Sequence, residues 1–182
     1  MTDRQQDFSG LKEVSKSHQF SLNKLDNFLK SELPDFSGIK EIKQFKGGQS
    51  NPTYLIKTYT KSFVLRRKPP GDLLKSAHAV DREYEVIKSL KKADFPVPTP
   101  YLLCKDESII GTIFYIMEFI QGRVFWDPDM PDCNKEERKA IYDDLNKNLA
   151  KLHGFNHESI GLTDFGVPGN YFSRQISRWT KQ

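Results

Sequence analysis

Apolar residues recur along the chain at spacings that predict one helix, then a strand-rich stretch, then further helices. The first helix follows Ser21, a candidate N-cap, because the apolar residues after it share one helical face: Leu22, Leu25, Phe28 and Leu29. Apolar and β-branched runs bounded by glycine or proline then predict five strands. These strands are Ile39–Phe45, Thr53–Thr58, Ser62–Arg67, Tyr101–Lys105 and Thr112–Phe119.

The same periodicity predicts more helices. One lies between the third and fourth strands and starts at the candidate cap Ser76, with an apolar side formed by Val80, Tyr84, Ile87 and Leu90. A longer one starts at Asn134, which forms a capping-box pattern with Glu137, and ends at Gly154. Its apolar side consists of Ile141, Leu145, Leu149 and Leu152. A short terminal helix is expected near Arg174–Trp179.

This order of elements divides the chain into three parts. Residues 1–20 are polar and are expected to form a flexible arm, and residues 21–120 carry the first helix and the five strands. Within 121–182, the stretch 121–132 has no hydrophobic period and contains two prolines, so it is expected to link the strands to an incomplete helical part. We therefore expect an α+β fold with a five-stranded antiparallel sheet.

Composition narrows the protein class but indicates no activity. A charged fraction of 29% and a hydrophobic fraction of 37% are typical of a globular protein. No apolar run approaches the roughly 20 residues that span a bilayer, and no targeting signal is visible. Cys104 and Cys133 have no metal-site or redox spacing and suit a reducing compartment. We therefore expect a cytoplasmic protein that binds no membrane.

The net charge of +4 is mild, and the densest basic run is Arg66–Lys68. Such a run admits a nucleic-acid interpretation, but neither interleaved aromatic residues nor zinc ligands accompany it. A patch that faces solvent or a phosphate is favoured, and no nucleic-acid partner is expected.

The loop between the first two strands is a candidate phosphate-binding segment. It contains Gly47, Gly48, Gln49, Ser50 and Asn51. Glycines let backbone amides approach a phosphate closely, and Ser50 or Asn51 could donate further hydrogen bonds. Taken alone, however, two adjacent glycines also fit an ordinary hairpin turn.

Two charged residues on neighbouring elements form a more specific pattern. Val64 and Arg66 share one face of the third strand, as do the valine and lysine of the protein-kinase strand that holds ATP phosphates. Glu83 lies three residues after Val80 and four before Ile87, inside an apolar stripe where an unpaired carboxylate is costly. We expect an Arg66–Glu83 pair like the one that positions phosphates in kinases. The alternatives are a solvent-facing basic strand end and a glutamate at the edge of the stripe.

The fifth strand resembles a kinase hinge, because it is apolar and runs into a linker that contains Gly122. In such a hinge, adenine pairs with the backbone after the gatekeeper residue. Met117 would be the gatekeeper, with the Glu118 carbonyl and the Ile120 amide as the pairing groups. Considered alone, the segment is also an ordinary buried strand with a polar end.

Several segments along the chain resemble those of a known family. They are Gly47–Tyr54, Val64–Gly71, Arg82–Tyr84, Phe95–Pro98, Tyr115–Glu118, Leu149–His153 and Tyr171–Gln175. As a set they resemble the aminoglycoside/choline-kinase-like phosphotransferases, and more narrowly the branch associated with acyl-CoA dehydrogenases of the family member 10 and 11 type. That branch also carries arginine where protein kinases have lysine, as at Arg66.

The resemblance implies a protein-kinase-like N-lobe with one αC-type helix, followed by the first helical part of the C-lobe. It implies ATP and Mg²⁺ as cofactors, and a small-molecule hydroxyl, in this branch that of a 4-hydroxyacyl-CoA, as acceptor. An acyl-CoA dehydrogenase domain or protein is an implied partner, and mitochondria or peroxisomes are alternative locations. The implied nucleotide-binding residues are Gly47, Gly48, Gln49, Ser50, Asn51, Val64, Arg66, Glu83, Met117, Glu118 and Ile120.

The catalytic loop of the family has no counterpart here. Asp164–Gly166 spells the kinase metal-binding triplet, but after His153 the positions of the base and the metal-binding asparagine hold Phe155 and Ile160. Neither side chain can accept a proton or bind a metal, so we interpret 164–166 as a surface turn. The base and the metal ligands are expected beyond Gln182, which leaves the apolar side of the helix at 134–153 exposed and this chain alone inactive. The alternative is a non-catalytic module that binds nucleotide or protein.

Overall fold

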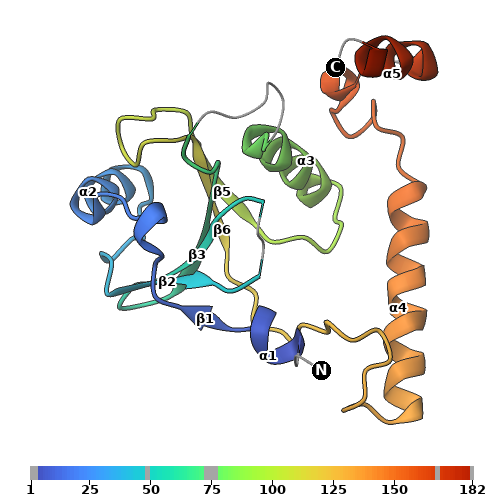
Figure 1. Cartoon of the computed structure of the whole chain (residues 1–182), viewed down its shortest axis with the longest axis horizontal. Helices are drawn as coiled ribbons and strands as arrows, with labels where there is room; N and C mark the ends of the chain where they lie inside the picture. Colours follow the sequence, from blue (N-terminus) through green and yellow to red (C-terminus); the bar gives the residue numbers. More distant parts are fainter. Residues whose placement is uncertain (1–3, 48–49, 72–77, 167–168, 181–182) are drawn as a thin grey trace.

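The computed structural model describes residues 4–47, 50–71, 78–166 and 169–180, and its centre is one antiparallel sheet (Figure 1). The strands follow the order β1-β2-β3-β4-β6-β5 across the sheet. Their bounds are Leu11–Lys12, Glu41–Phe45, Thr53–Lys57, Ser62–Arg67, Pro100–Cys104 and Phe114–Glu118 for β1 to β6. The α+β class is confirmed, and the five expected strands are β2 to β6. The expected number was one too low, because β1 is a sixth strand.

One face of the sheet is covered by α2, Leu22–Glu32, which begins at the predicted cap Ser21. The Ser21 hydroxyl accepts a hydrogen bond from the Lys24 amide. Leu25 and Leu29 are completely buried against the sheet residues Tyr54, Ile56, Phe63, Leu65, Phe114 and Ile116. Each such side chain contributes about 1.5–3 kcal/mol on burial, so this cluster is the main core.

The opposite face of the sheet is covered by α3, Val80–Lys92 (Figure 1). Val80 and Tyr84 pack against Tyr115 in a second, smaller core. Ala79 precedes α3 as its N-cap residue, whereas the expected cap Ser76 lies outside the described residues. Strand register places Leu55, Val64 and Met117 side by side across this face, and Thr53, Arg66 and Tyr115 in the next row.

The N-terminal arm contains short elements of secondary structure. Its described part forms a helical turn α1, Arg4–Phe8, then β1, and then a 3₁₀ turn at Lys16–His18. β1 pairs with the end of β2 through the registers Leu11 with Phe45 and Lys12 with Gln44. A polar segment that shows no hydrophobic period can thus still form backbone pairs with the edge of a sheet.

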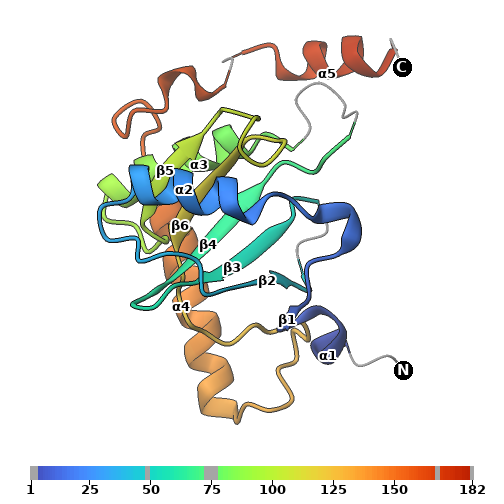
Figure 2. The same ribbon diagram turned by 90° about the vertical axis from the view of Figure 1, so that its left-hand side faces the viewer.

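Beyond the sheet, α4 spans Lys135–His153 and α5 spans Tyr171–Thr180. The predicted capping box is present, since Asn134 and Glu137 each bond the other's backbone amide, and Gly154 ends α4. As expected, the apolar side of α4 is exposed: Leu145 is 56% and Leu149 47% accessible. Figure 2 shows both helices outside the strand layer.

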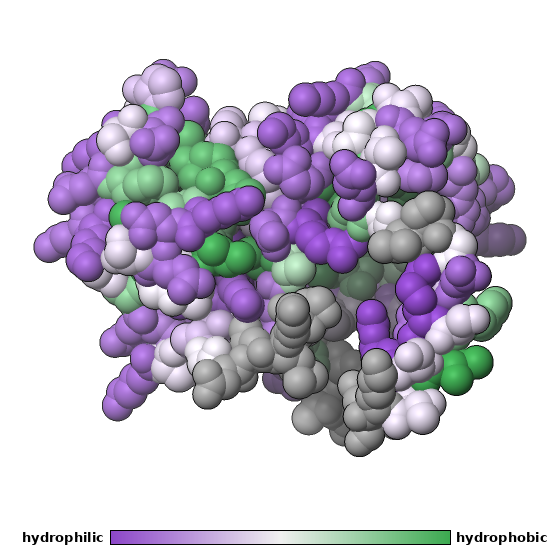
Figure 3. All heavy atoms as spheres, turned by 90° about the horizontal axis from the view of Figure 1, so that it is seen from above, coloured by the Kyte–Doolittle hydropathy of each residue, from purple (hydrophilic) through white to green (hydrophobic). Residues whose placement is uncertain are grey.

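The hydrophobic surface is divided into separate areas on the face shown in Figure 3, where green patches interrupt a mostly hydrophilic surface. Helix α5 carries four strongly exposed apolar residues, Tyr171, Phe172, Ile176 and Trp179. In the described ranges, no helix combines the length and the apolar character that a bilayer crossing requires.

Candidate functional site

The predicted Arg66–Glu83 ion pair joins β4 to α3. Arg66 Nε lies 2.7 Å from Glu83 Oε2, and Nη2 lies 3.5 Å from Oε1. Strand alternation turns Arg66 toward α3, and helical periodicity turns Glu83 toward the sheet. Both side chains remain partly accessible, at 25% and 35%, so solvent screens the pair and its contribution to stability is small. Its main consequence is to hold the guanidinium in one orientation.

Glu83 also accepts hydrogen bonds from two uncharged groups. Asn51 Nδ2 donates to Oε1 at 2.8 Å, and the Tyr115 hydroxyl donates to Oε2 at 3.3 Å. The carboxylate therefore receives donors from β4, β6 and the turn after β2. Because these three elements converge on one group, the position of Glu83 relative to the sheet is well defined.

Arg66 is held from its far side by the start of β3. Its Nη1 donates to Thr53 Oγ1 at 2.9 Å and to the Asn51 carbonyl at 3.4 Å. The guanidinium thus bridges α3 and the residues that follow the glycine loop. Four of the five Arg66 N–H groups thus have acceptors among the described residues, which leaves one Nη2 N–H and the positive charge for an anion.

Asn51 is almost completely buried, with 3% of its surface accessible, and it links Glu83 to His78. Its Oδ1 lies 3.0 Å from His78 Nδ1. Because the Asn51 amide nitrogen donates to Glu83, its oxygen must accept, so the proton of the imidazole lies on Nδ1. The side chain of Asn51, a predicted phosphate donor, is bonded to Glu83 and His78 in this structure.

Tyr115 is the buried member of the network, with 1% accessibility, and its ring centre lies 5.9 Å from that of Tyr84. Burial and the neighbouring Glu83 charge raise the pKa of the Tyr115 phenol. The hydroxyl therefore keeps its proton and donates to the carboxylate. Tyr115 and His78 were not recognised as site residues from the sequence, because neither spacing nor composition signals a contact between elements so far apart in the chain.

Within the glycine loop, the structure describes Gly47 and Ser50, whereas Gly48 and Gln49 lie outside the described residues. A Cβ on Gly47 would lie 2.9 Å from the Phe8 carbonyl oxygen and 3.2 Å from Trp126 Cζ2. Gly47 is therefore required by close packing against other parts of this chain. Ser50 is exposed.

The hinge candidate, residues 117–120, lies at the end of β6. Met117 lies opposite Val64 of β4 in the sheet register, so the two residues form adjacent positions on the face that carries Arg66. Ile120 is 57% accessible, and among the described residues no group accepts a hydrogen bond from its amide. The backbone amide that the sequence assigns to adenine is thus available for pairing.

Glu118 fixes the start of β5 to the end of β6. Its Oε2 accepts hydrogen bonds from the Thr99 amide at 3.0 Å and from the Thr99 hydroxyl at 2.8 Å. These bonds, from the backbone first and the hydroxyl second, lower the pKa of the Glu118 carboxyl. The Glu118 side chain is therefore committed to the strand junction, and only its backbone can contribute to the hinge.

The basic run at 66–68 does not form the continuous patch that the sequence suggested. Arg67 is 2% accessible, its Nε donates to Thr112 Oγ1 at 2.9 Å, and its guanidinium carbon lies 5.2 Å from the Phe20 ring centre. Burial lowers the pKa of Arg67. Arg66 is paired with Glu83 as well, so two of the three cations in this run bind groups of the same chain.

The kinase-like triplet 164–166 lies in an exposed 3₁₀ turn, Thr163–Phe165, as expected for a surface segment. Its contact with the sheet part is through Arg82, whose guanidinium carbon lies 4.3 Å from the centre of the Phe165 ring. The described residues contain no group of three His, Cys, Asp or Glu side chains that could hold a metal ion. His153 ends α4 and is exposed.

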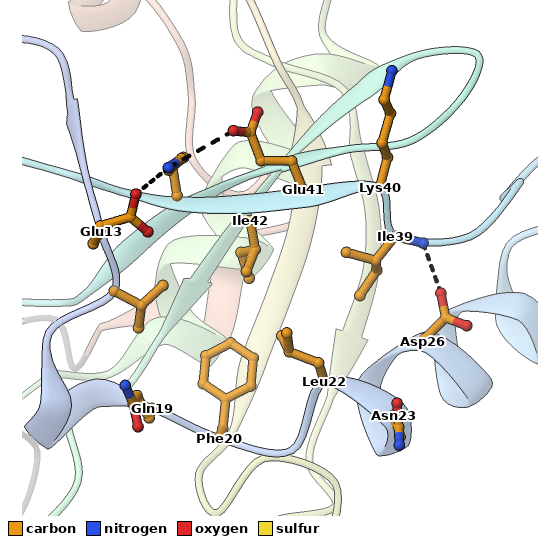
Figure 4. A pocket seen from close by; sticks show the side chains of 12 residues that line it. Glu13, Gln19, Phe20, Leu22, Asn23, Asp26, Ile39, Lys40, Glu41 and Ile42 are labelled. Carbon is orange, nitrogen blue, oxygen red and sulfur yellow. Dashed lines mark hydrogen bonds and ion pairs between the residues drawn. The ribbon is translucent and has the colours of Figure 1, made fainter.

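A cavity of about 810 Å³ lies on the other face of the sheet, between the N-terminal arm, the start of α2 and β2 (Figure 4). Phe20, Leu22, Ile39 and Ile42 form its apolar walls. Lys43 at its rim is ion-paired with Glu13 and Glu41. These carboxylates neutralise Lys43, and the cavity lies on the face of the sheet opposite to the Arg66–Glu83 pair.

Comparison with known proteins identifies the family of this chain. The model of the phosphotransferase enzyme family matches residues 41–182. Human acyl-CoA dehydrogenase family member 11 is 44% identical over 178 residues, which cover 96% of this chain and 23% of that protein. Mouse acyl-CoA dehydrogenase family member 10 is 44% identical over 170 residues, which cover 93% of this chain and 16% of that protein.

A solved structure is also similar. A crystal structure from Ralstonia eutropha JMP134, assigned as an aminoglycoside phosphotransferase, matches with a TM-score of 0.73 and 45% identity over 90% of this chain and 47% of that chain. This chain thus spans less than a quarter of the length of the curated relatives and about half of the solved one. The sheet and α3 are consistent with the N-terminal part of a kinase-like fold, and the chain belongs to the phosphotransferase enzyme family.

Proposed function

We propose that this chain is the nucleotide-binding portion of an ATP-dependent phosphotransferase that acts on a small-molecule hydroxyl. The observation that carries the proposal is the Arg66–Glu83 ion pair of 2.7 Å, because it fixes one cation at the place where kinase-like folds bind nucleotide phosphates. The surrounding network of Asn51, Thr53 and Tyr115 supports it, since every member restricts the orientation of Arg66 or Glu83.

The described residues fit the phosphate end of ATP. The Arg66 guanidinium is partly accessible and keeps one Nη2 N–H and its positive charge for phosphate oxygens, while Glu83 holds it in place. Phosphoryl transfer depends mostly on such positioning and charge stabilisation. In this proposal Arg66 contacts the phosphates, and Glu83 acts through Arg66.

The adenine end of the nucleotide is assigned to the edge of the same face. Val64 and Met117, adjacent across β4 and β6, supply an apolar surface for the base. The Ile120 amide donates a hydrogen bond to adenine, and the Glu118 carbonyl accepts one. The available Ile120 amide supports this assignment.

We further propose that the catalytic base and the Mg²⁺ ligands lie beyond Gln182 in the full-length protein. The described residues do not fit a metal ion, so their role in this proposal is limited to binding and orienting the nucleotide. The coverage of 47% of the solved relative and the exposed apolar side of α4 support this placement. The names of the curated relatives favour an acyl-CoA dehydrogenase as a linked domain or partner, and the acceptor in this proposal is the 4-hydroxyacyl-CoA that the family resemblance implies.

Nucleotide binding by the purified chain tests the proposal. A fluorescent ATP analogue, displaced by unlabelled ATP, should bind the wild type, and Arg66→Ala should weaken binding at least tenfold, about 1.4 kcal/mol. Arg66→Lys keeps the charge but loses the planar fork, so an intermediate affinity is expected. Lys92→Ala removes an exposed cation of α3 and should leave binding unchanged.

The outcomes that contradict the proposal are specific. A wild type without measurable ATP affinity, or an Arg66→Ala variant that binds as tightly as the wild type, would overturn nucleotide binding at this site. The chain alone should transfer no phosphate from ATP to a hydroxyacyl-CoA or a sugar-like acceptor. Clear turnover that is lost in Arg66→Ala would instead place the chemistry within residues 1–182.

A further inference from the structure

The N-terminal arm contacts both the glycine loop and the linker that follows β6. The family model matches from residue 41 onward, so α1 and β1 lie before the matched range. Two sets of interactions attach this segment, one on each side. Figure 1 shows α1 between β1 and the segment that leads to α4.

On the loop side, the attachment is through the backbone. β1 pairs with Gln44 and Phe45, the last residues of β2, and the Lys46 amide then donates to the Gly10 carbonyl at 3.1 Å. The pairing therefore extends to the residue before Gly47. The base of the glycine loop is held on the edge of β2 that is opposite to β3.

On the linker side, one side chain makes a pair of hydrogen bonds. Gln5 Nε2 donates to the Val124 carbonyl at 2.7 Å, and Gln5 Oε1 accepts from the Trp126 amide at 3.1 Å. A glutamine amide matches this backbone pattern because it has one donor side and one acceptor side. The rings of Phe8 and Trp126 add a contact, with centroids 5.1 Å apart.

The two attachments meet at Gly47. Its missing side chain would fall 2.9 Å from the Phe8 carbonyl and 3.2 Å from the Trp126 ring. The arm, the linker and the base of the loop thus pack against one another with no space for a methyl group. A shift of any one of them must move the other two.

We propose that residues 5–12 form a clasp that fixes the base of the glycine loop to the hinge linker, with Gln5 and Phe8 as positioning residues for nucleotide binding. This inference rests on the proposed nucleotide site. In that site the loop is next to the phosphate end of the nucleotide, and the linker begins directly after Ile120 at the adenine end, so the clasp sets the distance between the two ends before the ligand arrives. A preorganised site loses less conformational freedom on binding and therefore binds more tightly.

Hydrogen exchange of the ligand-free chain tests the clasp directly. Gln5→Ala and Phe8→Ala should each raise exchange at the Lys46 and Trp126 amides at least tenfold, whereas Asp7→Ala, an exposed change on the same helical turn, should not. Phe8→Tyr keeps the ring, so both amides should stay as protected as in the wild type. Gly47→Ala should reproduce the effect from the loop side, because its Cβ displaces the Phe8 carbonyl.

ATP affinity is measured on the same variants. The positioning role predicts that Gln5→Ala and Phe8→Ala weaken binding about threefold to tenfold, about 0.7–1.4 kcal/mol, with far-UV circular dichroism unchanged. Unchanged exchange at Lys46 and Trp126 in both variants would overturn the clasp. Increased exchange with unchanged ATP affinity would overturn the positioning role. A wild type that binds no ATP would overturn the proposed function, and exchange would still report on the clasp.

Discussion

Glu83 accepts hydrogen bonds from three separate segments of the chain. Its two oxygens accept from Arg66 on β4, from Asn51 in the turn before β3, and from Tyr115 on β6. A single carboxylate therefore sets the geometry between three segments of the sheet and α3. Loss of one donor leaves the others in place, so the role of each can be measured separately.

Asn51 offers a residue-scale test of this network. Asn51→Ala removes the Glu83 and His78 contacts of a buried amide and should lower the free energy of unfolding by about 1–3 kcal/mol. Asn51→Asp should cost more near neutral pH, because a second carboxylate would face Glu83 without a proton between them. Chemical denaturation measures both changes.

The matched control is Asn23→Ala, since Asn23 is an exposed asparagine on α2. It should change the unfolding free energy by less than about 0.5 kcal/mol. Equal stability of Asn51→Ala and the wild type would show that Asn51 does not support Glu83.

At the scale of elements, the site depends on the junction between β5 and β6. Thr99 precedes β5, and its amide and hydroxyl both donate to the Glu118 carboxylate at the end of β6. The junction therefore fixes where the chain leaves the sheet and where the hinge linker begins. Its strength should depend on pH, because a carboxylate accepts these bonds better than a carboxylic acid.

The Glu118 pKa is lowered in the folded protein, so its contribution to stability is present above the unfolded value of about 4.3 and is lost as pH falls through the folded value. Glu118→Gln should therefore be less stable than the wild type at pH 7. The difference should shrink progressively below about pH 4.3. Urea titrations between pH 7 and pH 3 measure it.

Thr99→Val serves as the partner variant, because it removes the hydroxyl donor and keeps the backbone amide. It should reproduce part of the Glu118→Gln loss at pH 7. A Glu118→Gln deficit that stays constant down to pH 3 would mean that the carboxylate charge does not strengthen the junction.

At the scale of the whole molecule, α4 and α5 leave apolar surface without a cover from the described part of the chain. Leu145, Leu149 and Leu152 line one side of α4, and Phe172 and Trp179 lie on α5. The end of α4 is anchored to the region after α3, where Lys151 Nζ donates to the Asp94 carbonyl at 2.6 Å and the rings of Phe95 and Phe155 lie 5.9 Å apart. The rest of α4 is much less engaged.

Exposed apolar surface of this kind should make the isolated chain self-associate. The double substitution Leu145→Lys, Leu149→Lys should shift the chain toward the monomer in light scattering over a concentration series, with its unfolding free energy changed little. Lys147→Ala, an exposed polar position on the same helix, is the control. A wild-type chain that stays monomeric at high concentration would contradict the expectation.

Sequence patterns were sufficient to predict the strands β2 to β6, the helices α2 to α5 and the Arg66–Glu83 pair. The hydrophobic period of a segment indicates which of its faces is buried. Glu83 lies within an apolar stripe and requires a cation, because an unpaired buried charge is costly. The hinge position followed from the same order of elements. Its binding role stays a prediction.

Contacts between residues far apart in the chain could be found only in the tertiary structure. Gln5 and Val124 are 119 positions apart, and Tyr115 meets Glu83 across 32 positions. Such contacts leave no period or spacing in the sequence, because they arise when the sheet, α3 and the N-terminal arm pack together. For the same reason β1 was missed, since its backbone pairing depends on the edge of β2 and not on the pattern of its own two residues.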